Sequence, residues 1–223
     1  MLNKYIGGGK DPTLSKLGST SWDKQKLLTK KSTEKDVEAL INLYLARKNN
    51  RGFVYSPDSE ILSALKQSFA YEETPDQQKA ISDIIKDLEK RTPMDRLVYG
   101  DVGFGKTEVA LRAIVSVVSS GRCVFFLAPT TVLSDQHFIT CKNRLSPLGI
   151  NVELLSRFRT KKQQESILGK LGGGHIDVLV GTHRLLGEDV STKRLGMLVV
   201  DEEHRFGVSH KEYIRSLKKR VDV

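Results

Sequence analysis

Short apolar segments alternate with amphipathic segments along the second half of the chain, beginning near Arg96. The apolar runs are rich in β-branched and aromatic residues, which is typical of buried strands, and the segments between them have helical spacing. We expect strands near residues 96–99, 122–127, 151–155, 176–180 and 196–200, and helices near residues 106–119, 132–145, 161–170 and 208–218. This alternation specifies βαβ units, so the predicted fold class is α/β, with a doubly wound, mostly parallel sheet covered on both faces.

A helical pattern also covers residues 22–48, where apolar side chains recur at the i, i+3, i+4, i+7 spacing of one helix face. This face consists of Val37, Leu40, Ile41, Tyr44 and Leu45. The polar stretch at residues 49–52 ends the helix. The simplest interpretation is a helix that packs on the domain that follows it, and a helix that binds a partner is the alternative.

Two shorter helices are expected before the first strand. One begins at Ser56, which would cap it with Pro57 in the first turn, and it runs to Phe69. The other begins at Thr74, because Thr74 and Gln77 have the spacing of a capping box. Its buried face would consist of Ile81, Ile84, Ile85 and Leu88.

The composition fits one α/β domain with an appendage, at 223 residues, 39% hydrophobic and 28% charged. The lack of a long apolar run and of a signal-peptide core favours a cytoplasmic protein without a membrane anchor. The net charge of +9 is compatible with a polyanionic partner but does not require one. Cys123 and Cys141 lack the spacing of a metal or redox motif, so we expect both to be buried and reduced.

The clearest chemical motif lies at residues 100–107, where GDVGFGKT matches GxxxxGK[ST] between a predicted strand and a predicted helix. The glycines let backbone N–H groups turn toward phosphates, and the helix N-terminus adds positive potential. Lys106 would reach the β- and γ-phosphates of ATP, and Thr107 would ligate Mg²⁺. The expected nucleotide contacts are Gly100, Asp101, Val102, Gly103, Phe104, Gly105, Lys106, Thr107 and Glu108.

A second motif follows the apolar strand near residues 196–200, where Asp201 and Glu202 come directly after MLVV. Asp201 would hold the metal ion, and Glu202 would orient and deprotonate the attacking water. An acid pair after a strand is often only a helix cap. The phosphate loop upstream makes a nucleotide hydrolase the stronger interpretation.

Together these motifs resemble the superfamily 2 helicases, because DEEH at residues 201–204 is similar to their DExH box. APTT at residues 128–131 follows a strand, as motif Ia does, and GTH at residues 181–183 resembles motif Ib. The resemblance implies a RecA-like lobe of the P-loop NTPase class. It also adds His204 to a catalytic set that already holds Lys106, Asp201 and Glu202.

The same resemblance implies contacts with DNA and with adenine. The DNA backbone would be touched by Thr130, Thr131, Arg157, Gly181, Thr182 and His183. Without the family, these segments are only polar turns at strand ends. The segment Thr74–Gln77 resembles the adenine-reading Q motif, with Phe69 as the stacking ring, while Gln77 also serves the capping box.

A narrower resemblance is to the bacterial transcription-repair coupling factors and, slightly less, to the fork-reversal helicases. It is carried by GDVGFGKTEVA, APTT, SRFRT, GTHRLL and DEEHRFG. Before the motor, YIGG, LSKLGS and Trp22 resemble the end of an RNA-polymerase-binding domain. A fork-reversal helicase would carry an oligonucleotide-binding wedge domain at that place.

This resemblance implies three parts and a piece of a larger protein. Residues 1–21 would be the remnant of the polymerase-binding domain, residues 22–52 a basic connecting helix, and residues 53–223 the first motor lobe, which stops before motif III. The intact protein would translocate on double-stranded DNA at the expense of ATP, remove stalled RNA polymerase and recruit excision-repair proteins.

Two alternatives remain beside this function. One is the motor lobe of a fork-reversal or branch-migration helicase. The other concerns the isolated chain, which would hold nucleotide as a docking fragment without turnover, because the second motor lobe would supply the missing catalytic arginine. A small-molecule kinase or a GTPase also carries a phosphate loop, but neither class predicts the DExH box.

Overall fold

The computed structural model describes residues 20–223, so the expectations for residues 1–19 lie outside the described part of the chain. The chain divides into two units, Met1–Leu45 and Ala46–Val223. Helix α1 (Thr20–Asn49) confirms the helix expected at residues 22–48 and provides the described part of the first unit. Its predicted buried face is about half exposed, and the packing of this helix on the following domain stays a prediction.

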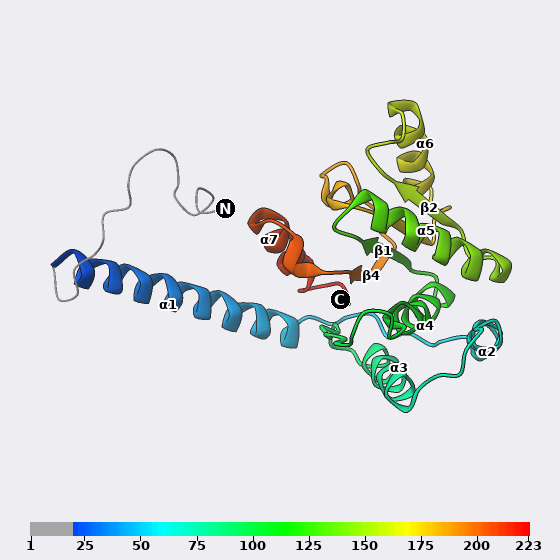
Figure 1. Ribbon diagram of the computed structural model, residues 1–223, viewed down its shortest axis with the longest axis horizontal. Coiled ribbons are helices and arrows are strands. Elements are labelled where there is room, and N and C mark those ends of the chain that lie inside the picture. The colour runs from blue at the N-terminus through cyan, green and yellow to red at the C-terminus, as the bar shows by residue number, and fades with distance from the viewer. Residues whose placement is uncertain (1–19) are drawn as a thin grey trace. The chain divides into compact units, whose positions relative to one another are not determined.

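A four-stranded, entirely parallel sheet forms the centre of the second unit (Figure 1). Its strands are β1 (Cys123–Leu127), β2 (Val152–Leu155), β3 (Val178–Gly181) and β4 (Leu195–Val200). The order across the sheet is β2-β3-β1-β4, so β1 is hydrogen-bonded on both sides. The predicted α/β class and the parallel sheet are therefore confirmed.

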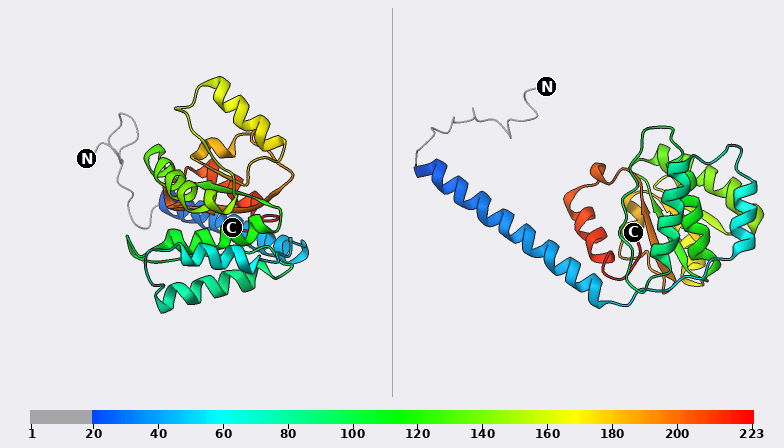
Figure 2. Two further views of the ribbon diagram at one scale, coloured as in Figure 1. Left: turned by 90° about the vertical axis from the view of Figure 1, so that its right-hand side faces the viewer. Right: turned by 90° about the horizontal axis from the view of Figure 1, so that it is seen from below.

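Helices cover both faces of this sheet, because its strands are apolar on both faces. Val124 and Phe126 of β1 face a core shared with α4 (Lys106–Ser119) and α5 (Thr131–Leu145). Phe125 and Leu127 face a second core shared with α6 (Lys161–Gly172) and α7 (Val208–Leu217). In the left view of Figure 2, α3 and α4 lie on one side of the strands and the yellow helix α6 lies on the other.

Short 3₁₀ helices complete the second unit. They are η2 (Ser146–Leu148), η3 (His183–Leu186) and η4 (Glu203–Arg205). The last two follow β3 and β4 directly, so they shape the turns that carry the predicted motifs. No helix within residues 20–223 is both long and apolar enough to cross a bilayer.

Helices α2 (Ser59–Gln67) and α3 (Pro75–Leu88) precede the phosphate loop. The capping box of α3 is confirmed, because the Thr74 hydroxyl accepts from the Gln77 N–H and the Gln77 amide oxygen accepts from the Thr74 N–H. The predicted start of α2 at Ser56 is wrong. Asp58 caps this helix instead, since its carboxylate accepts two backbone N–H groups of the first turn, at 2.8 and 3.2 Å.

The strand expected at residues 96–99 is absent from the sheet. This segment is extended, but its ladder holds only two hydrogen bonds, from Arg96 N–H to the Val223 carbonyl and from Val223 N–H to the Met94 carbonyl. Leu97 and Tyr99 are almost fully exposed. Because so few residues pair beside it, the segment is an extended lead into the phosphate loop.

Candidate nucleotide and nucleic-acid site

The predicted motifs meet at one edge of the sheet. All four strands are parallel, so the turns that follow them lie at the same, carboxyl edge. Helix α4 runs back to the start of β1, which places its N-terminus at that edge too. The sheet thereby brings together the phosphate loop, both acids after β4 and the turns after β1, β2 and β3.

The phosphate loop has the backbone that a phosphate cradle requires. Gly103 and Gly105 have φ angles of 82° and 71°, in the left-handed region that favours glycine. Gly105 is the N-cap of α4 and provides no side-chain cap, so the first N–H groups of the helix are available to an anion. The Lys106 ammonium donates to the carbonyls of Gly100 and Asp101, at 2.5 and 2.7 Å, inside the curve of the loop.

This loop fits the phosphate chain of a nucleotide. A methyl group added at Gly103 would meet no atom within 4 Å, so the loop is open on that side. Uncapped N–H groups and a lysine ammonium together form a donor set suited to phosphate oxygens. The Thr107 side chain is partly exposed in the first turn of α4, where its hydroxyl is a suitable ligand for a divalent cation.

Gln77 ties the start of α3 to the phosphate loop. Its amide nitrogen donates to the Phe104 carbonyl at 2.8 Å. A Cβ at Gly105 would lie 2.5 Å from the same nitrogen, which shows how closely the two segments approach. Gln77 therefore serves the capping box and the loop at once, and its contact with adenine stays a prediction.

Asp201 extends β4 by one residue, because its N–H donates to the Leu127 carbonyl of β1 at 2.9 Å. Its carboxylate Oδ2 lies 2.9 Å from Nε2 of His137 on α5. This hydrogen bond and, more weakly, the nearby charge of Lys106 hold the pKa of Asp201 below its ordinary value, against the opposing effect of partial burial. Asp201 is thus a carboxylate anion near neutral pH, as an anchor for a divalent cation must be.

Glu202 is the one non-glycine residue among residues 20–223 with a positive φ, at 51°. Such a backbone costs about 1–3 kcal/mol and persists where the surrounding structure imposes it, often at functional sites. Arg205 Nε lies 2.7 Å from Glu202 Oε2, an ion pair whose angle does not satisfy a hydrogen bond. The Glu202 carboxylate, which directly follows β4, is therefore paired with Arg205 and lies on a strained backbone.

The histidine that reaches Asp201 is His137, and the catalytic role of His204 in the segment that resembles the DExH box stays a prediction. His204 is exposed in η4, and the contact recorded for it is made by its carbonyl, which accepts from Lys211. His137 was not among the expected residues. The sequence gives little indication of its role, because His137 lies on the second turn of α5, beyond the segment that resembles motif Ia.

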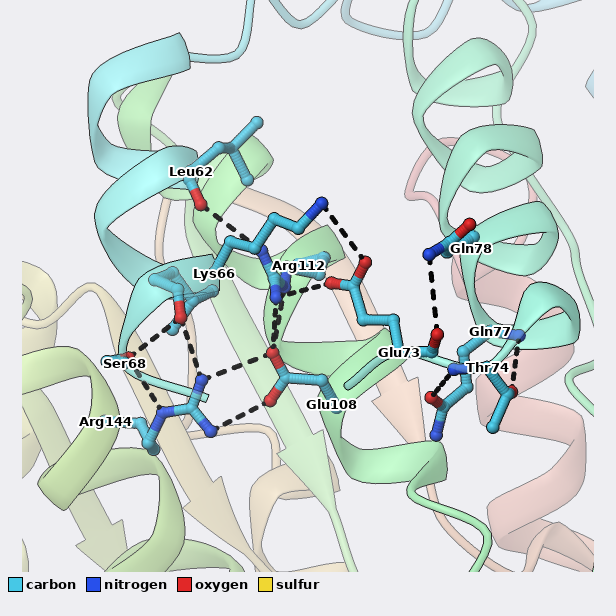
Figure 3. Close-up of polar contacts among 11 residues, drawn as sticks. Leu62, Lys66, Ser68, Glu73, Thr74, Gln77, Gln78, Glu108, Arg112 and Arg144 are labelled. Carbon is cyan, nitrogen blue, oxygen red and sulfur yellow. Dashed lines mark hydrogen bonds and ion pairs between the residues drawn. The ribbon is translucent and has the colours of Figure 1, made fainter. Parts of the chain in front are cut away.

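Glu108, expected among the nucleotide contacts, points elsewhere (Figure 3). Its carboxylate, 3% exposed, is ion-paired with Arg112 of α4 and Arg144 of α5, at 2.9 Å each. Arg112 also pairs at 2.7 Å with Glu73, which immediately precedes the capping box. The Glu108 side chain thus belongs to a buried cluster of four charges that joins α4, α5 and the segment leading to Gln77.

The aromatic side chains near Gln77 differ in their surroundings. Phe69, the predicted stacking ring, is partly buried, with the Arg144 guanidinium 5.4 Å from its ring centroid. Tyr71 presents its edge toward Phe69 at 5.7 Å and is 78% exposed.

The six predicted DNA contacts divide into two groups. Thr130, Arg157 and His183 are exposed and Thr131 is partly exposed, all at the carboxyl edge of the sheet. Gly181 is the buried last residue of β3, and Thr182 is only 4% exposed. Gly181 has no room for a side chain, because an added Cβ would lie 2.5 Å from the Leu155 carbonyl. The contacts of Gly181 and Thr182 with DNA stay predictions.

Comparison with known proteins agrees with this geometry. The family model described as DEAD/DEAH box helicase matches residues 74–222. The chain is 46% identical over its whole length to the transcription-repair-coupling factor of Bacillus subtilis (strain 168) and 48% identical to that of Staphylococcus epidermidis (strain ATCC 12228 / FDA PCI 1200), and it spans 19% of each of these relatives.

Solved structures show the same fold. A structure of RecG bound to a three-way DNA junction superposes with a TM-score of 0.72 and 34% identity, over 81% of this chain and 24% of that chain. A Saccharomyces cerevisiae dbp5 structure superposes with a TM-score of 0.55 at 17% identity, over 74% of this chain and 44% of that one.

Proposed function

The chain belongs to the DEAD/DEAH box helicase family, and from this premise we propose that it is the ATP-binding lobe of a double-stranded DNA translocase. The observation that carries the proposal is the meeting of the Lys106 loop and the Asp201–Glu202 pair at one sheet edge, with Lys106 close enough to act on the Asp201 carboxylate. Phosphoryl transfer requires this combination of a phosphate cradle, a cation anchor and a base.

Each residue of the site has a role in this proposal. The loop N–H groups and Lys106 bind the phosphates, while Thr107 and Asp201 anchor Mg²⁺, which neutralises charge on the phosphate oxygens when bound. Glu202 orients the attacking water and accepts its proton. Gln77, with an aromatic ring upstream of it, recognises adenine.

The isolated chain should bind nucleotide without turning it over efficiently. An arginine that reaches the transferred phosphoryl group contributes about 10³–10⁵ in rate. Three of the arginines in the turns at this edge have other contacts: Arg184 pairs with Asp189, Arg205 pairs with Glu202, and Arg157 lies over the Phe158 ring. We therefore propose that the arginine comes from a second lobe of the complete protein.

We propose that this lobe binds duplex DNA. The exposed residues at the turns after β1, β2 and β3 are suited to phosphate and sugar contacts rather than to base edges. Binding should be weak, independent of sequence and reduced by salt. The slope of log K against log salt should be about −0.9 for each phosphate that is neutralised.

Fluorescence anisotropy with a labelled duplex tests this proposal. Arg157→Ala should make the slope shallower by about one contact. Arg91→Ala is the matched control, because it removes an exposed arginine beyond the far end of α3. Salt-insensitive or strongly sequence-selective binding, or ATP hydrolysis by the chain alone that duplex DNA raises many-fold, would contradict the proposal.

For the complete protein we propose transcription-repair coupling in the bacterial cytoplasm, with RNA polymerase and excision-repair proteins as partners. The support is the 46–48% identity to coupling factors, which extends over the whole chain, including the segment before the lobe. The likeness to a RecG structure that holds a three-way DNA junction supports the alternative of a helicase that acts on branched DNA. A preference of the complete protein for branched over linear DNA would favour that alternative.

A further inference from the structure

The contact between His137 and Asp201 joins two elements that are distant in the sequence. The residues are 64 positions apart, on α5 and at the end of β4, yet Nε2 and Oδ2 lie 2.9 Å apart. Both side chains are largely covered, at 14% and 30% exposed. None of the motifs found in the sequence assigns a role to His137.

Both partners of this contact are held in place. The His137 ring packs against the ring of Phe126 in β1, with centroids 4.5 Å apart and an interplanar angle of 31°. Asp201 is fixed by its N–H, which donates to Leu127, the next residue of β1. The central strand therefore supports the histidine and the aspartate at adjacent positions.

The direction of the hydrogen bond follows from the chemistry of the two groups. An ionised carboxylate has no hydrogen to give, so His137 must carry its hydrogen on Nε2 and donate it. The bond occupies Oδ2 of Asp201 and limits rotation of the carboxylate. Oδ1 is then the oxygen left for a cation or for a water bound to one.

We propose that His137 is a positioning residue of the nucleotide site, which orients the Asp201 carboxylate for the divalent cation that accompanies the phosphates. This inference rests on the proposed function, since it assigns Asp201 to the cation. Groups that hydrogen-bond a metal ligand from behind typically change metal affinity by about 10–100-fold when they are removed. A contact that only joins α5 to β4 would change the stability of the fold and leave cation affinity unchanged.

Two variants of His137 separate these roles. His137→Phe keeps an aromatic ring against Phe126 but removes the donor, while His137→Gln places an amide N–H near the position of Nε2. We would measure binding of a non-hydrolysable ATP analogue to the 223-residue chain by calorimetry, in EDTA and over a series of Mg²⁺ concentrations. His137→Phe should raise the Mg²⁺ concentration for half-maximal enhancement about tenfold, and His137→Gln should restore it to within about threefold. Affinity in EDTA should stay at the parent value in both.

Two further variants complete the design. His175→Phe, an exposed histidine in the turn between α6 and β3, should match the parent. Asp201→Ala should abolish the enhancement of nucleotide binding by Mg²⁺.

The outcomes separate the two claims. If Asp201→Ala abolishes the enhancement while His137→Phe matches the parent, the positioning role of His137 is overturned and the proposed site stands. If Asp201→Ala leaves the enhancement intact, the assignment of Asp201 fails and the role of His137 fails with it. Thermal melting of each variant verifies folding, and should His137→Phe not fold, His137→Leu, which also lacks the donor, takes its place with the same expected tenfold rise.

Discussion

Two aromatic residues, Phe69 and Tyr71, lie shortly before Gln77 and differ in how accessible their rings are. A ring that stacks on a base needs an accessible face. Phe69 is partly buried and has Arg144 over one face, whereas Tyr71 is largely exposed. At the scale of single residues, Tyr71 is therefore the better candidate for adenine, although the sequence pattern singled out Phe69.

We expect Tyr71→Ala to weaken ATP binding about fivefold or more, because stacking of a base on an aromatic ring contributes about 1–3 kcal/mol. The melting temperature should stay unchanged, since the side chain is exposed. Phe69→Ala should instead lower the melting temperature. Calorimetry with ATP and with inorganic tripolyphosphate, which lacks a base, measures the effect. Loss of ATP affinity in Phe69→Ala at unchanged stability would favour the original assignment.

A sequence motif predicts the contacts of a side chain well only where its partners lie within the same motif. The Lys106 ammonium is bound by carbonyls of its own loop, five and six residues away, so its position depends on residues within the motif alone. The contact of His137 with Asp201 and the burial of Thr182 depend on packing between elements. Glu108 adjoins the motif in the sequence, but its side chain pairs with Arg144, 36 residues further on, which the motif does not indicate.

At the scale of elements, the cluster of Glu73, Glu108, Arg112 and Arg144 holds α4 and α5 to the segment before Gln77 (Figure 3). Removing one partner of a buried ion pair leaves an uncompensated charge, which costs about 3–5 kcal/mol. We expect Glu108→Ala to lower the free energy of unfolding by that amount in urea titrations.

The matched control for this prediction is Glu165→Ala on α6, which is exposed and should change stability by less than about 0.5 kcal/mol. Equal stability of the two variants would show that the cluster does not stabilise the fold. Arg144 also contacts Phe69 and the Leu65 carbonyl, so its replacement would be harder to interpret.

Asp222 forms a second buried polar contact between elements. Its carboxylate accepts from the Met94 N–H at 2.6 Å and from the Tyr55 hydroxyl at 2.9 Å, and that hydroxyl also lies 3.0 Å from the Gly196 carbonyl. Burial raises the pKa of Asp222, in spite of these donors. As pH rises above the ordinary pKa of a carboxyl, the unfolded chain ionises at Asp222 while the folded state keeps the proton, so the contribution of Asp222 to stability falls until the raised pKa is passed and then stays low.

We expect Asp222→Asn to be at least as stable as the parent at neutral pH. The amide oxygen would accept from Met94, and the amide nitrogen would donate to Tyr55, whose hydroxyl would donate to Gly196. Urea titrations at about pH 5 and about pH 8 should show the advantage of the variant growing with pH, because only the parent ionises there. A variant less stable at the higher pH would indicate that the charged carboxylate is favoured.

The predicted bounds of helices and strands match the structure where the apolar periodicity and the capping residues indicate the same ends. Helix α4 spans the predicted residues 106–119, and β1, β2, β3 and β4 each lie within one or two residues of the predicted ranges. The segment at residues 96–99 has the composition of a strand. A strand in a sheet also needs a second strand to pair with, and composition does not predict which segments pair. Asp58 and not Ser56 caps α2. Aspartate and serine are about equally good caps, so residue type alone could not select between them.

At the scale of the whole molecule, alternation of strands and helices predicts a parallel sheet, but it does not predict the order β2-β3-β1-β4. That order depends on which strand is the central one. It matters for function because β1 is central, and Asp201 and His137 both contact it. We propose that the carboxyl edge of this sheet is a nucleotide site built around Lys106.

Calorimetric titration of the 223-residue chain with ATP and Mg²⁺ tests that claim most directly, with Lys106→Ala as the paired variant. The parent should bind measurably but weakly, because one lobe supplies only part of the contacts. Lys106→Ala should bind about 10- to 100-fold more weakly, since hydrogen bonds to charged groups contribute about 1.5–3 kcal/mol. Equal affinity of the parent and Lys106→Ala, in protein shown to be folded, would contradict the assignment of this edge as the ATP site.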